Sequence, residues 1–405
     1  TRRAVFARSL MSPTLIIVLL SMLLGIQPVA TDLYLPALPA IKAEFGAELS
    51  QVQLTLSALL LAFGTSQLVW GPLSDRFGRR PILLCGLATF TMAGLGCVSA
   101  SSMQELIVWR ALQGAAMGAV VMCARAIVRD LYTPETGAGV MSKALTGLGF
   151  LACASAPLGG LLTDLWSWHA ALSLVMGFGA VALGLVAWQF KETVHHKNPH
   201  ALKLNVLATT WWHILRHPTF VAFTCVSIGS YGGLFTFLAS SSFVFINLLG
   251  LARWQYGLLL FSMAFTYLLG TVLCRRLLAR LGVAHTVAIG GALSLIGGCW
   301  MAVDAWLGAS SVVSLMGPFY FFILAHGIHQ PCGQSGAVGP FPKAAGAASA
   351  LGGFLMMVAA FVTGLWLGAA KDGSAMPMAQ SIAFWSVLTA LSAWGLVLRR
   401  GGPRV

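Results

Sequence analysis

Two charged side chains, Asp32 and Arg110, lie deep inside long apolar stretches of the sequence. Asp32 lies about nine residues before the end of the first stretch and Arg110 about seven residues after the start of the fourth, roughly 14 and 10 Å of helix rise. A charge at this depth in a membrane span costs several kcal/mol unless it has a partner or a water-filled cavity. We therefore predict that both side chains face one central cavity and pair with each other.

Such a pair has a clear chemical use. Protonation of Asp32 would release Arg110, and this gives a two-state element that a proton and a substrate can both bias. Two simpler interpretations stay open. Asp32 could cap the irregular Leu-Pro-Ala-Leu-Pro stretch that follows it, and Arg110 could only tie neighbouring spans together.

Three further titratable or cationic residues lie inside apolar stretches. His326 and His329 are spaced i, i+3, so they share one face of a helix. A histidine titrates near physiological pH and could carry protons or contact a substrate, but both could equally be satisfied core histidines. Arg125 lies deeper in its span than a helix-end residue, which favours a position in the cavity or in a lock between helices.

The elements that carry these residues are membrane spans. Of the 405 residues, 58% are hydrophobic and only 9% are charged. Soluble domains carry about 25% charged residues, so soluble enzymes and disordered chains are excluded. A span needs about 20 apolar residues. Segments of that size predict twelve spans, at 14–41, 51–73, 81–100, 103–131, 137–164, 167–190, 218–247, 253–274, 283–304, 308–338, 344–368 and 377–399.

The distribution of charge predicts the orientation of these spans. The net charge is +13, and the basic residues are spread among short loops, which argues against nucleic acid as a partner. An even number of spans places both termini on one side, and the loops of that side carry most of the Lys and Arg residues. The other side carries only Lys42, Arg253 and Lys371. The positive-inside rule therefore predicts a multi-pass protein of the bacterial inner membrane with both termini in the cytoplasm.

One polar interruption, Lys191–Asn205, divides the spans into two sets of six. The stretch after it, Thr209–His217, is typical of an interfacial amphipathic segment. We predict an N-terminal bundle over 1–190, a cytoplasmic linker over 191–217 and a C-terminal bundle over 218–405. An internal echo agrees with a duplicated bundle, because Asp-Arg-Phe-Gly at 75–78 matches Ala-Arg-Leu-Gly at 279–282, an offset of 204 residues.

The loop Gly71–Pro81, with the sequence GPLSDRFGRRP, resembles the signature loop of the major facilitator superfamily. Glycines permit a tight turn and close helix approach, while Asp75 and the arginines can exchange partners as helix bundles rock. A merely topogenic basic loop would explain the arginines but not Gly71, Asp75 and Gly78. The resemblance implies an all-α integral membrane protein with the major facilitator fold, twelve transmembrane helices in two six-helix bundles.

Four more segments resemble the drug/proton antiporters of the Bcr/CflA type. They are Thr31–Pro39, Arg110–Gly114, Arg125–Tyr132 and Ala156–Gly160. The last is similar to the antiporter motif Gly-Pro-x-x-Gly-Gly, with alanine in place of its first glycine, and this departure weakens it as a sign of export over uptake.

The residue patterns and the resemblance together predict two groups of site residues. The proton-coupling and substrate-cavity group is Asp32, Arg110, Gln113, Tyr34, His326 and His329. The conformational-gating group is Gly71, Asp75, Arg76, Gly78, Arg79, Arg80, Arg125, Arg129, Asp130, Pro157, Gly159 and Gly160. Within it, Arg129 and Asp130 are expected to join Asp75 and Arg76 in a charge cluster, although a solvated helix end would explain the same pair.

The expected function is proton-coupled efflux (antiport) of drug-like amphipathic compounds, such as phenicols or bicyclomycin, by alternating access. The alternative is a proton-coupled carrier for one specific metabolite on the same fold, either an amino acid or siderophore exporter or an uptake symporter. The sequence has no nucleotide-binding motif and no catalytic or metal-ligand constellation, so we expect a transporter and not an enzyme. Protons are the expected coupling ion, with no cofactor and no metal. The expected partners are a small-molecule substrate and the lipid bilayer, with the protein acting as a monomer.

Overall fold

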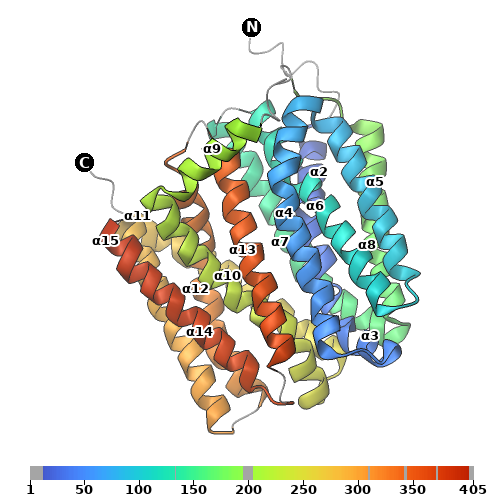
Figure 1. Cartoon of the computed structure of the whole chain (residues 1–405), viewed down its shortest axis with the longest axis vertical. Coiled ribbons are helices and arrows are strands. Elements are labelled where there is room, and N and C mark those ends of the chain that lie inside the picture. The colour runs from blue at the N-terminus through green and yellow to red at the C-terminus, as the bar shows by residue number, and fades with distance from the viewer. Residues whose placement is uncertain are drawn as a thin grey trace.

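The computed structural model describes residues 12–132, 134–194, 204–308, 311–341, 344–370 and 373–400. Helices and short connections account for these residues, with no strand among them, so the all-α prediction is confirmed (Figure 1). Eleven helices in this part of the chain are long and apolar enough to cross a membrane, and one of them is a double-length helix.

The helices occur in two consecutive sets. The first set is α2 (Pro13–Asp32), the 3-10 turn η1 (Leu35–Ala37), α3 (Leu38–Phe45), α4 (Leu49–Phe77), α5 (Arg79–Val98), α6 (Met103–Leu131), α7 (Pro134–Leu165) and α8 (Trp168–Gln189). The second set is α9 (Leu204–Leu215), α10 (Pro218–Ser242), the π-helical turn η2 (Phe243–Leu248), α11 (Arg253–Trp306), α12 (Val312–Val338), α13 (Ala345–Ala369), α14 (Met376–Ser392), the π-helical turn η3 (Ala393–Val397) and α15 (Leu398–Arg400). All twelve predicted spans fall on these helices.

The first span is interrupted directly after Asp32, and two prolines explain why. A helical residue accepts a hydrogen bond from the N–H four residues later, and proline has no N–H. Pro36 therefore leaves the carbonyl of Asp32 without a helical donor, and Pro39 does the same for Leu35. The α-helix ends at Asp32, and the chain passes through η1 before α3 begins. By contrast, Pro157, Pro318 and Pro331 lie inside continuous helices.

The double-length helix α11 contains the eighth and ninth predicted spans. Its backbone leaves the helical conformation at Gly282, with φ 73° and ψ 177°. Gly78, between α4 and α5, has a similar conformation with φ 109° and ψ 162°. This region of backbone space is essentially restricted to glycine. The repeated segments at 75–78 and 279–282 therefore end in the same kind of glycine turn, at equivalent loops of the two halves.

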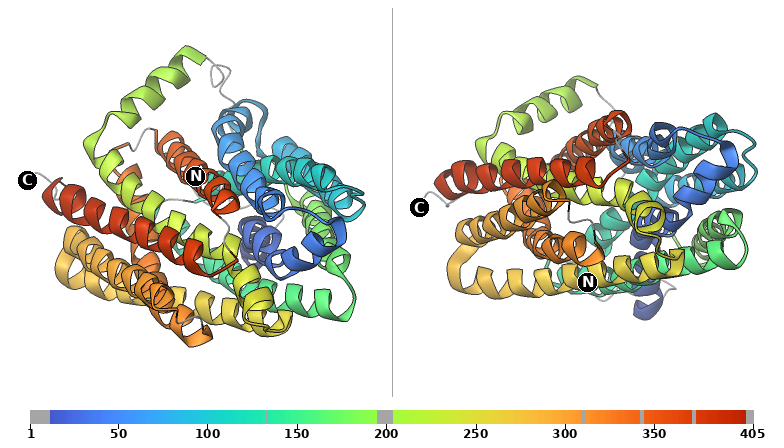
Figure 2. Two further views of the ribbon diagram at one scale, coloured as in Figure 1. Left: turned by 60° about the horizontal axis from the view of Figure 1, so that its bottom comes forward. Right: turned by 90° about the horizontal axis from the view of Figure 1, so that it is seen from below.

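The two sets of helices lie side by side, as the view from below shows (Figure 2). Across the division between them, α4 packs along α13 and α7 packs along α11. We call the end that carries the Gly78 and Gly282 turns and α9 the basic end, because the described arginines of the 71–80 loop lie there. The opposite end, with Lys42 and Arg253, is the distal end (Figure 1).

At the distal end, polar contacts join the two sets of helices. Arg253 at the start of α11 forms an ion pair with Asp164 of α7, with Nη1 2.9 Å from Oδ1. The other oxygen of Asp164 accepts from the backbone N–H of Trp254 at 3.2 Å. Gln53 of α4 donates through Nε2 to the carbonyl of Ala239 in α10 at 3.4 Å. The distal ends of the two sets are therefore closed against each other.

The predicted interfacial segment is the helix α9. Ile214 is fully buried, whereas the Trp212 ring is 57% exposed and has the guanidinium of Arg216 over its face at 4.3 Å. One apolar and one exposed face are what an amphipathic helix at a membrane surface requires. The middle of the predicted linker, 195–203, lies outside the described residues.

Candidate functional site

Asp32 lies at the last residue of α2, where the first span is interrupted, and it faces helices of both sets. Its carboxylate interacts electrostatically with Tyr231 of α10, Tyr256 of α11 and Cys153 of α7. Its side chain is partly accessible, and its described hydrogen bond is from Thr31 Oγ1 at 2.9 Å. No basic side chain among the described residues lies within ion-pair distance of it. Asp32 is therefore an unpaired carboxylate between the two bundles.

Arg110 does not form the direct pair with Asp32 that the sequence led us to expect. Its guanidinium donates to the carbonyl of Ala30 at 2.9 Å and to Gln113 Oε1 at 2.8 Å. It also lies over the ring of Tyr34, 4.2 Å from the centroid. The carbonyl at Ala30 is therefore the partner that α2 offers to the arginine. Because the Arg110 side chain is 0% exposed, it lies in the packed interior and not on an accessible cavity wall.

The other two predicted cavity residues of the first bundle are also buried. Tyr34 is 0% exposed, and its hydroxyl is hydrogen-bonded to Thr55 Oγ1 of α4 at 2.7 Å. Gln113 is 0% exposed as well. Arg110 Nε and Gln113 Nε2 have no hydrogen-bond partner, so two buried donors stay unsatisfied beside Asp32's helix. Such donors are costly to bury unless a charge or water can reach them.

His326 and His329 lie on α12, in the second bundle. His326 Nδ1 is 2.8 Å from Ser230 Oγ of α10, and its ring packs against Tyr267 of α11. His329 Nε2 is 3.4 Å from the carbonyl of Val287, also in α11. Both rings are buried and tie α12 to its neighbours. His326 Nδ1 has a partner, as a satisfied core histidine requires, whereas His329 Nδ1 is buried without one.

Arg125 has a different environment from Arg110, although both are on α6. Its side chain is exposed, whereas that of Arg110 is fully buried. It has no ion-pair partner within the described ranges. Arg125 thus places an exposed cation without an ion-pair partner in the basic half of the molecule, on the helix that also carries Arg110.

A charge cluster lies at the basic end, but its central residue is Arg79 and not Arg76. Arg79 donates to Asp75 at 2.7 Å and to Asp130 at 2.9 Å, and its side chain is almost fully buried. Arg129 lies 4.0 Å from Asp75 at the exposed edge of the cluster. Arg76 instead extends over the Phe77 ring. The cluster connects the start of α5 to the ends of α4 and α6, as expected for Asp75, Arg129 and Asp130.

The segment after α8 contributes a carboxylate that sequence reasoning missed. Glu192 accepts four backbone N–H bonds, from Arg79, Arg80, Thr193 and Val194, at 2.9 to 3.1 Å. It therefore caps the first turn of α5, where backbone donors have no helical acceptor. In return, Arg80 donates to the carbonyls of Phe190 and Ala187 at the end of α8. The signal in the sequence was that Glu192 is the sole acid between 191 and 217.

This cap predicts a pH-dependent stability. Partial burial alone would raise the pKa of Glu192, but the four backbone N–H donors outweigh it and hold the pKa below its usual value. The stabilisation is therefore complete above the ordinary glutamate pKa of about 4.3 and is lost as the pH falls through the lower folded-state pKa. Glu192→Gln is expected to cost about 1 kcal/mol at pH 7. At pH 7 the purified Glu192→Gln variant should unfold at a lower temperature than wild type. The two thermal midpoints should become equal below about pH 4, where Glu192 of wild type is protonated as well. Lys191→Gln is the matched control, and a difference independent of pH would contradict the prediction.

The two glycine turns allow a matched comparison. Alanine at Gly78 or Gly282 is strained by the positive φ, at a cost of about 1–3 kcal/mol. Only at Gly78 would the added Cβ also overlap the carboxylate of Glu192, whereas Gly282 has open space there. We expect Gly78→Ala to lower the thermal midpoint more than Gly282→Ala, and Glu192→Gln to reduce that difference. Equal effects at the two glycines would contradict the described cap.

The predicted antiporter-motif residues in α7 lie against the broken first span and α11. Gly159 leaves no room for a side chain beside the carbonyl of Leu33. A Cβ on Gly160 would lie 2.5 Å from the carbonyl oxygen of Arg253, and one on Gly257 would lie 2.7 Å from Cα of Pro157. These small residues let α7 pack closely against the interrupted first span on one side and against α11 of the second bundle on the other. Gly71 has the methyl end of Met122 as its nearest neighbour, which places it against α6.

The comparisons with known proteins agree with this architecture. A family model described as Major Facilitator Superfamily matches residues 16–364, most of the chain. The chain belongs to the Major Facilitator Superfamily. Its fold is also that of a D-xylose–proton symporter, with a TM-score of 0.73, 17% identity and coverage of 95% of this chain and 97% of that one. Members of this superfamily are transporters and multi-pass membrane proteins, which agrees with the helices of this chain that are long and apolar enough to cross a membrane.

Within the superfamily, the chain is similar to drug-resistance proteins of bacteria. It is 27% identical to the bicyclomycin resistance protein homolog of Haemophilus influenzae over 389 residues, 96% of this chain and 97% of the relative. It is 30% identical to multidrug resistance protein D of Escherichia coli over 346 residues, 85% and 86% of the two chains. The resemblance to superfamily antiporters of the Bcr/CflA type is confirmed by these relatives.

Proposed function

We propose that this transporter exports amphipathic drug-like compounds in exchange for protons, with Asp32 as the proton acceptor. The observation that carries the proposal is the unpaired, partly accessible carboxylate of Asp32 between the two bundles. An ionised carboxylate without a cation is costly inside a membrane span, and protonation removes that cost. Because Asp32 faces α7, α10 and α11, a change in its charge acts on helices of both halves.

Alternating access is the proposed transport mechanism. The closed distal end and the glycine turns at the basic end support two bundles that rock about a central axis. We assign the basic end to the cytoplasm by the positive-inside rule, so both termini are cytoplasmic. In this orientation the ion pair between Arg253 and Asp164 closes the periplasmic side, and its separation would open that side.

Arg110 has a supporting role in this proposal. Its bond to the Ala30 carbonyl holds the end of α2 two residues before Asp32. The unpartnered Nε of Arg110 and Nε2 of Gln113 provide donors that can stabilise negative charge near the interrupted span. Arg110 is therefore proposed as a positioning residue for Asp32 and not as a direct substrate contact.

The substrate class follows from the relatives and from the chemistry of the interior. The names of the two relatives refer to bicyclomycin and to multiple drugs, and we extend this to compounds of the same amphipathic kind, phenicols among them. Tyr231 of α10, which is partly accessible, and the exposed Arg125 offer aromatic surface and one cation to such compounds. Promiscuous export is expected to depend little on any single polar contact.

The test is proton movement in proteoliposomes with an inside-acid pH gradient and a pH-sensitive dye. Bicyclomycin, phenicols, lipophilic cations and amino acids are added in turn to vesicles with the wild-type protein. Dissipation of the gradient by several unrelated drugs supports proton-coupled drug antiport. A response to a single metabolite and to no drug would overturn the drug-export proposal in favour of a specific carrier.

A further inference from the structure

The arginines at the basic end of the second bundle lack the acidic partners that those of the first bundle have. In the first bundle, Arg79 is bonded by two aspartates at 2.7 and 2.9 Å. In the repeated segment of the second bundle, Ala279 takes the place of Asp75, and the sequence has no acid between Glu192 and Asp304. The second loop therefore keeps the glycine turn of its counterpart but not its charge compensation.

Three exposed arginine side chains converge at this end, Arg276 and Arg280 of α11 and Arg399 of α15. Arg276 and Arg280 are spaced i, i+4, so they share one face of α11. The short helix α15 packs against α11 (Figure 1), and Trp394 just before it donates through Nε1 to the carbonyl of Ala288 in α11 at 3.0 Å. Arg399 follows Trp394 by about 7.5 Å of helix rise toward the basic end, which brings it to the level of the glycine turn in α11. None of the three arginines forms an ion pair with a described residue.

The side chains beside these arginines are apolar and exposed. Leu281 and Val283 flank the glycine turn, Trp394 and Leu398 precede Arg399, and all four are between 38% and 46% exposed. Exposed apolar side chains at the end of a membrane span contact acyl chains, and a tryptophan there lies at the level of the headgroups. Cations beside such a surface complement a molecule that joins an anionic group to an apolar tail, whereas a free phosphate would leave the apolar side chains unused.

We infer that this surface, formed by Arg276, Arg280 and Arg399 with the apolar side chains beside them, binds an anionic phospholipid. The phosphate of the headgroup accepts hydrogen bonds from the guanidinium groups, whose planar fork matches phosphate oxygens. The acyl chains contact the exposed leucine and valine side chains. Basic groups of adjacent membrane helices near the bilayer surface recognise headgroups in this way.

The orientation of the spans alone does not require this arrangement. The positive-inside rule counts the basic residues of each loop and is satisfied wherever on the loop they lie. Here arginines from two segments far apart in the sequence meet on one surface, without acids and beside apolar side chains. The inference goes beyond the proposed function and does not depend on it, because lipid binding is measured without transport.

Competition binding to the immobilised full-length protein in detergent tests the inference. Tritiated phosphatidylglycerol is the probe. The competitors are unlabelled phosphatidylglycerol, phosphatidylethanolamine with the same acyl chains, and inorganic phosphate. With wild type, phosphatidylglycerol is expected to displace the probe at a concentration at least about tenfold lower than phosphatidylethanolamine does, because only the former has a net negative headgroup. Inorganic phosphate at the same concentrations should not displace it, and retention of the probe should fall as the salt concentration rises from about 0.1 M to about 1 M.

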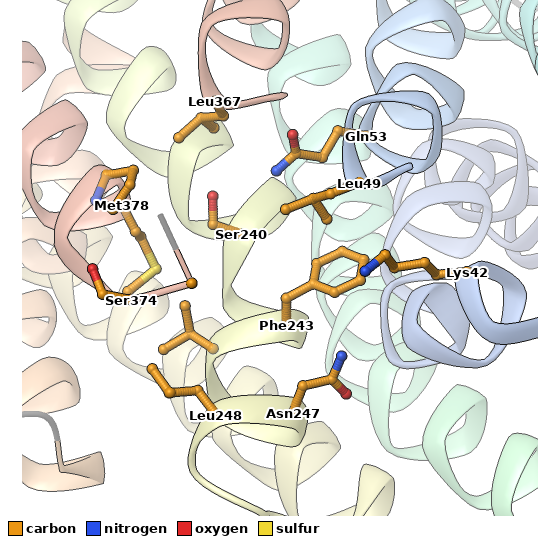
Figure 3. Close-up of a pocket in the computed structure, with 13 residues that line it drawn as sticks. Lys42, Leu49, Gln53, Ser240, Phe243, Asn247, Leu248, Leu367, Ser374 and Met378 are labelled. Carbon is orange, nitrogen blue, oxygen red and sulfur yellow. The ribbon is translucent and has the colours of Figure 1, made fainter. Parts of the chain in front are cut away.

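Variants of the arginines assign the binding to this surface. Arg280→Gln combined with Arg399→Gln should weaken binding of phosphatidylglycerol about 25-fold, since each arginine near an anionic lipid contributes about fivefold. Arg280→Lys combined with Arg399→Lys keeps both charges and should retain most of the affinity. Two controls should bind like wild type. Arg216→Gln removes an exposed arginine next to α9 at the same end. Lys42→Gln removes a cation from a pocket of about 250 Å³ between the bundles at the distal end (Figure 3).

Three outcomes would overturn the inference, and a thermal midpoint for each variant confirms that it is folded. The first is equal competition by phosphatidylglycerol and phosphatidylethanolamine with wild type. The second is equal affinity of the glutamine double variant and Arg216→Gln, or an equal loss in the glutamine and lysine double variants, because neither result is compatible with recognition by these charges. The third is displacement of the probe by inorganic phosphate, which would assign the arginines to a free anion and not to a lipid.

Discussion

Asp32→Asn is expected to abolish substrate-driven proton movement. The variant keeps the size and hydrogen-bonding capacity of the side chain, including the bond with Thr31, but it cannot take up a proton. With Asp32 as the coupling acid between the bundles, the rate of substrate-driven proton movement should fall about 100-fold. This factor corresponds to the loss of a coupling free energy of about 3 kcal/mol. The measurement is dye-reported dissipation of an inside-acid gradient in proteoliposomes.

The control for this prediction is Asp304→Asn. Asp304 also lies in a transmembrane helix, near the distal end of α11, but it is not among the groups that interact with Asp32. This variant should retain transport. Full substrate-driven proton movement by Asp32→Asn would eliminate the proposed proton acceptor and direct attention to His326 and His329.

A disulfide across the distal end is expected to stop transport reversibly. Gly368 of α13 and Ser50 of α4 are so close that a Cβ added to Gly368 would lie 2.9 Å from Ser50 Cβ. Disulfides join Cβ atoms about 3.5–4.5 Å apart, so a small shift brings the pair Ser50→Cys with Gly368→Cys within bonding distance. Because the two residues belong to different bundles, the bond would prevent the distal end from opening. Under oxidation, transport should fall to the level of empty vesicles, and a reducing agent should restore it.

Each single-cysteine variant serves as a control for the disulfide. Both should transport substrate equally under oxidising and reducing conditions, since the native cysteines are the same in all three proteins. The extent of cross-linking is measured by labelling of free thiols under denaturing conditions. A fully cross-linked protein that transports as fast as the same protein after reduction would rule out opening at the distal end. It would also overturn the alternating-access proposal.

The spans and their interruptions could be predicted because they depend on local sequence. A run of about 20 apolar residues specifies a membrane helix whatever its neighbours are. Pro36 removes the N–H that would extend α2 past Asp32, and this effect is contained within four residues. The glycines at 78 and 282 likewise mark turns that other residues adopt only at a cost.

The partners of the charged residues could not be predicted, because they depend on which helix faces pack together. Arg110 donates from its guanidinium to a backbone carbonyl 80 residues earlier. Every residue has such a carbonyl, so no side-chain pattern predicts this contact. Arg79 replaces Arg76 in the charge cluster because the turn at Gly78 starts a new helix and directs Arg79 between α4 and α6. Glu192 caps α5 from 113 residues away. Composition and proline positions thus determined the spans and where they end, whereas helix packing alone decided that Asp32 stays without a cation and that Arg110 is buried beside it.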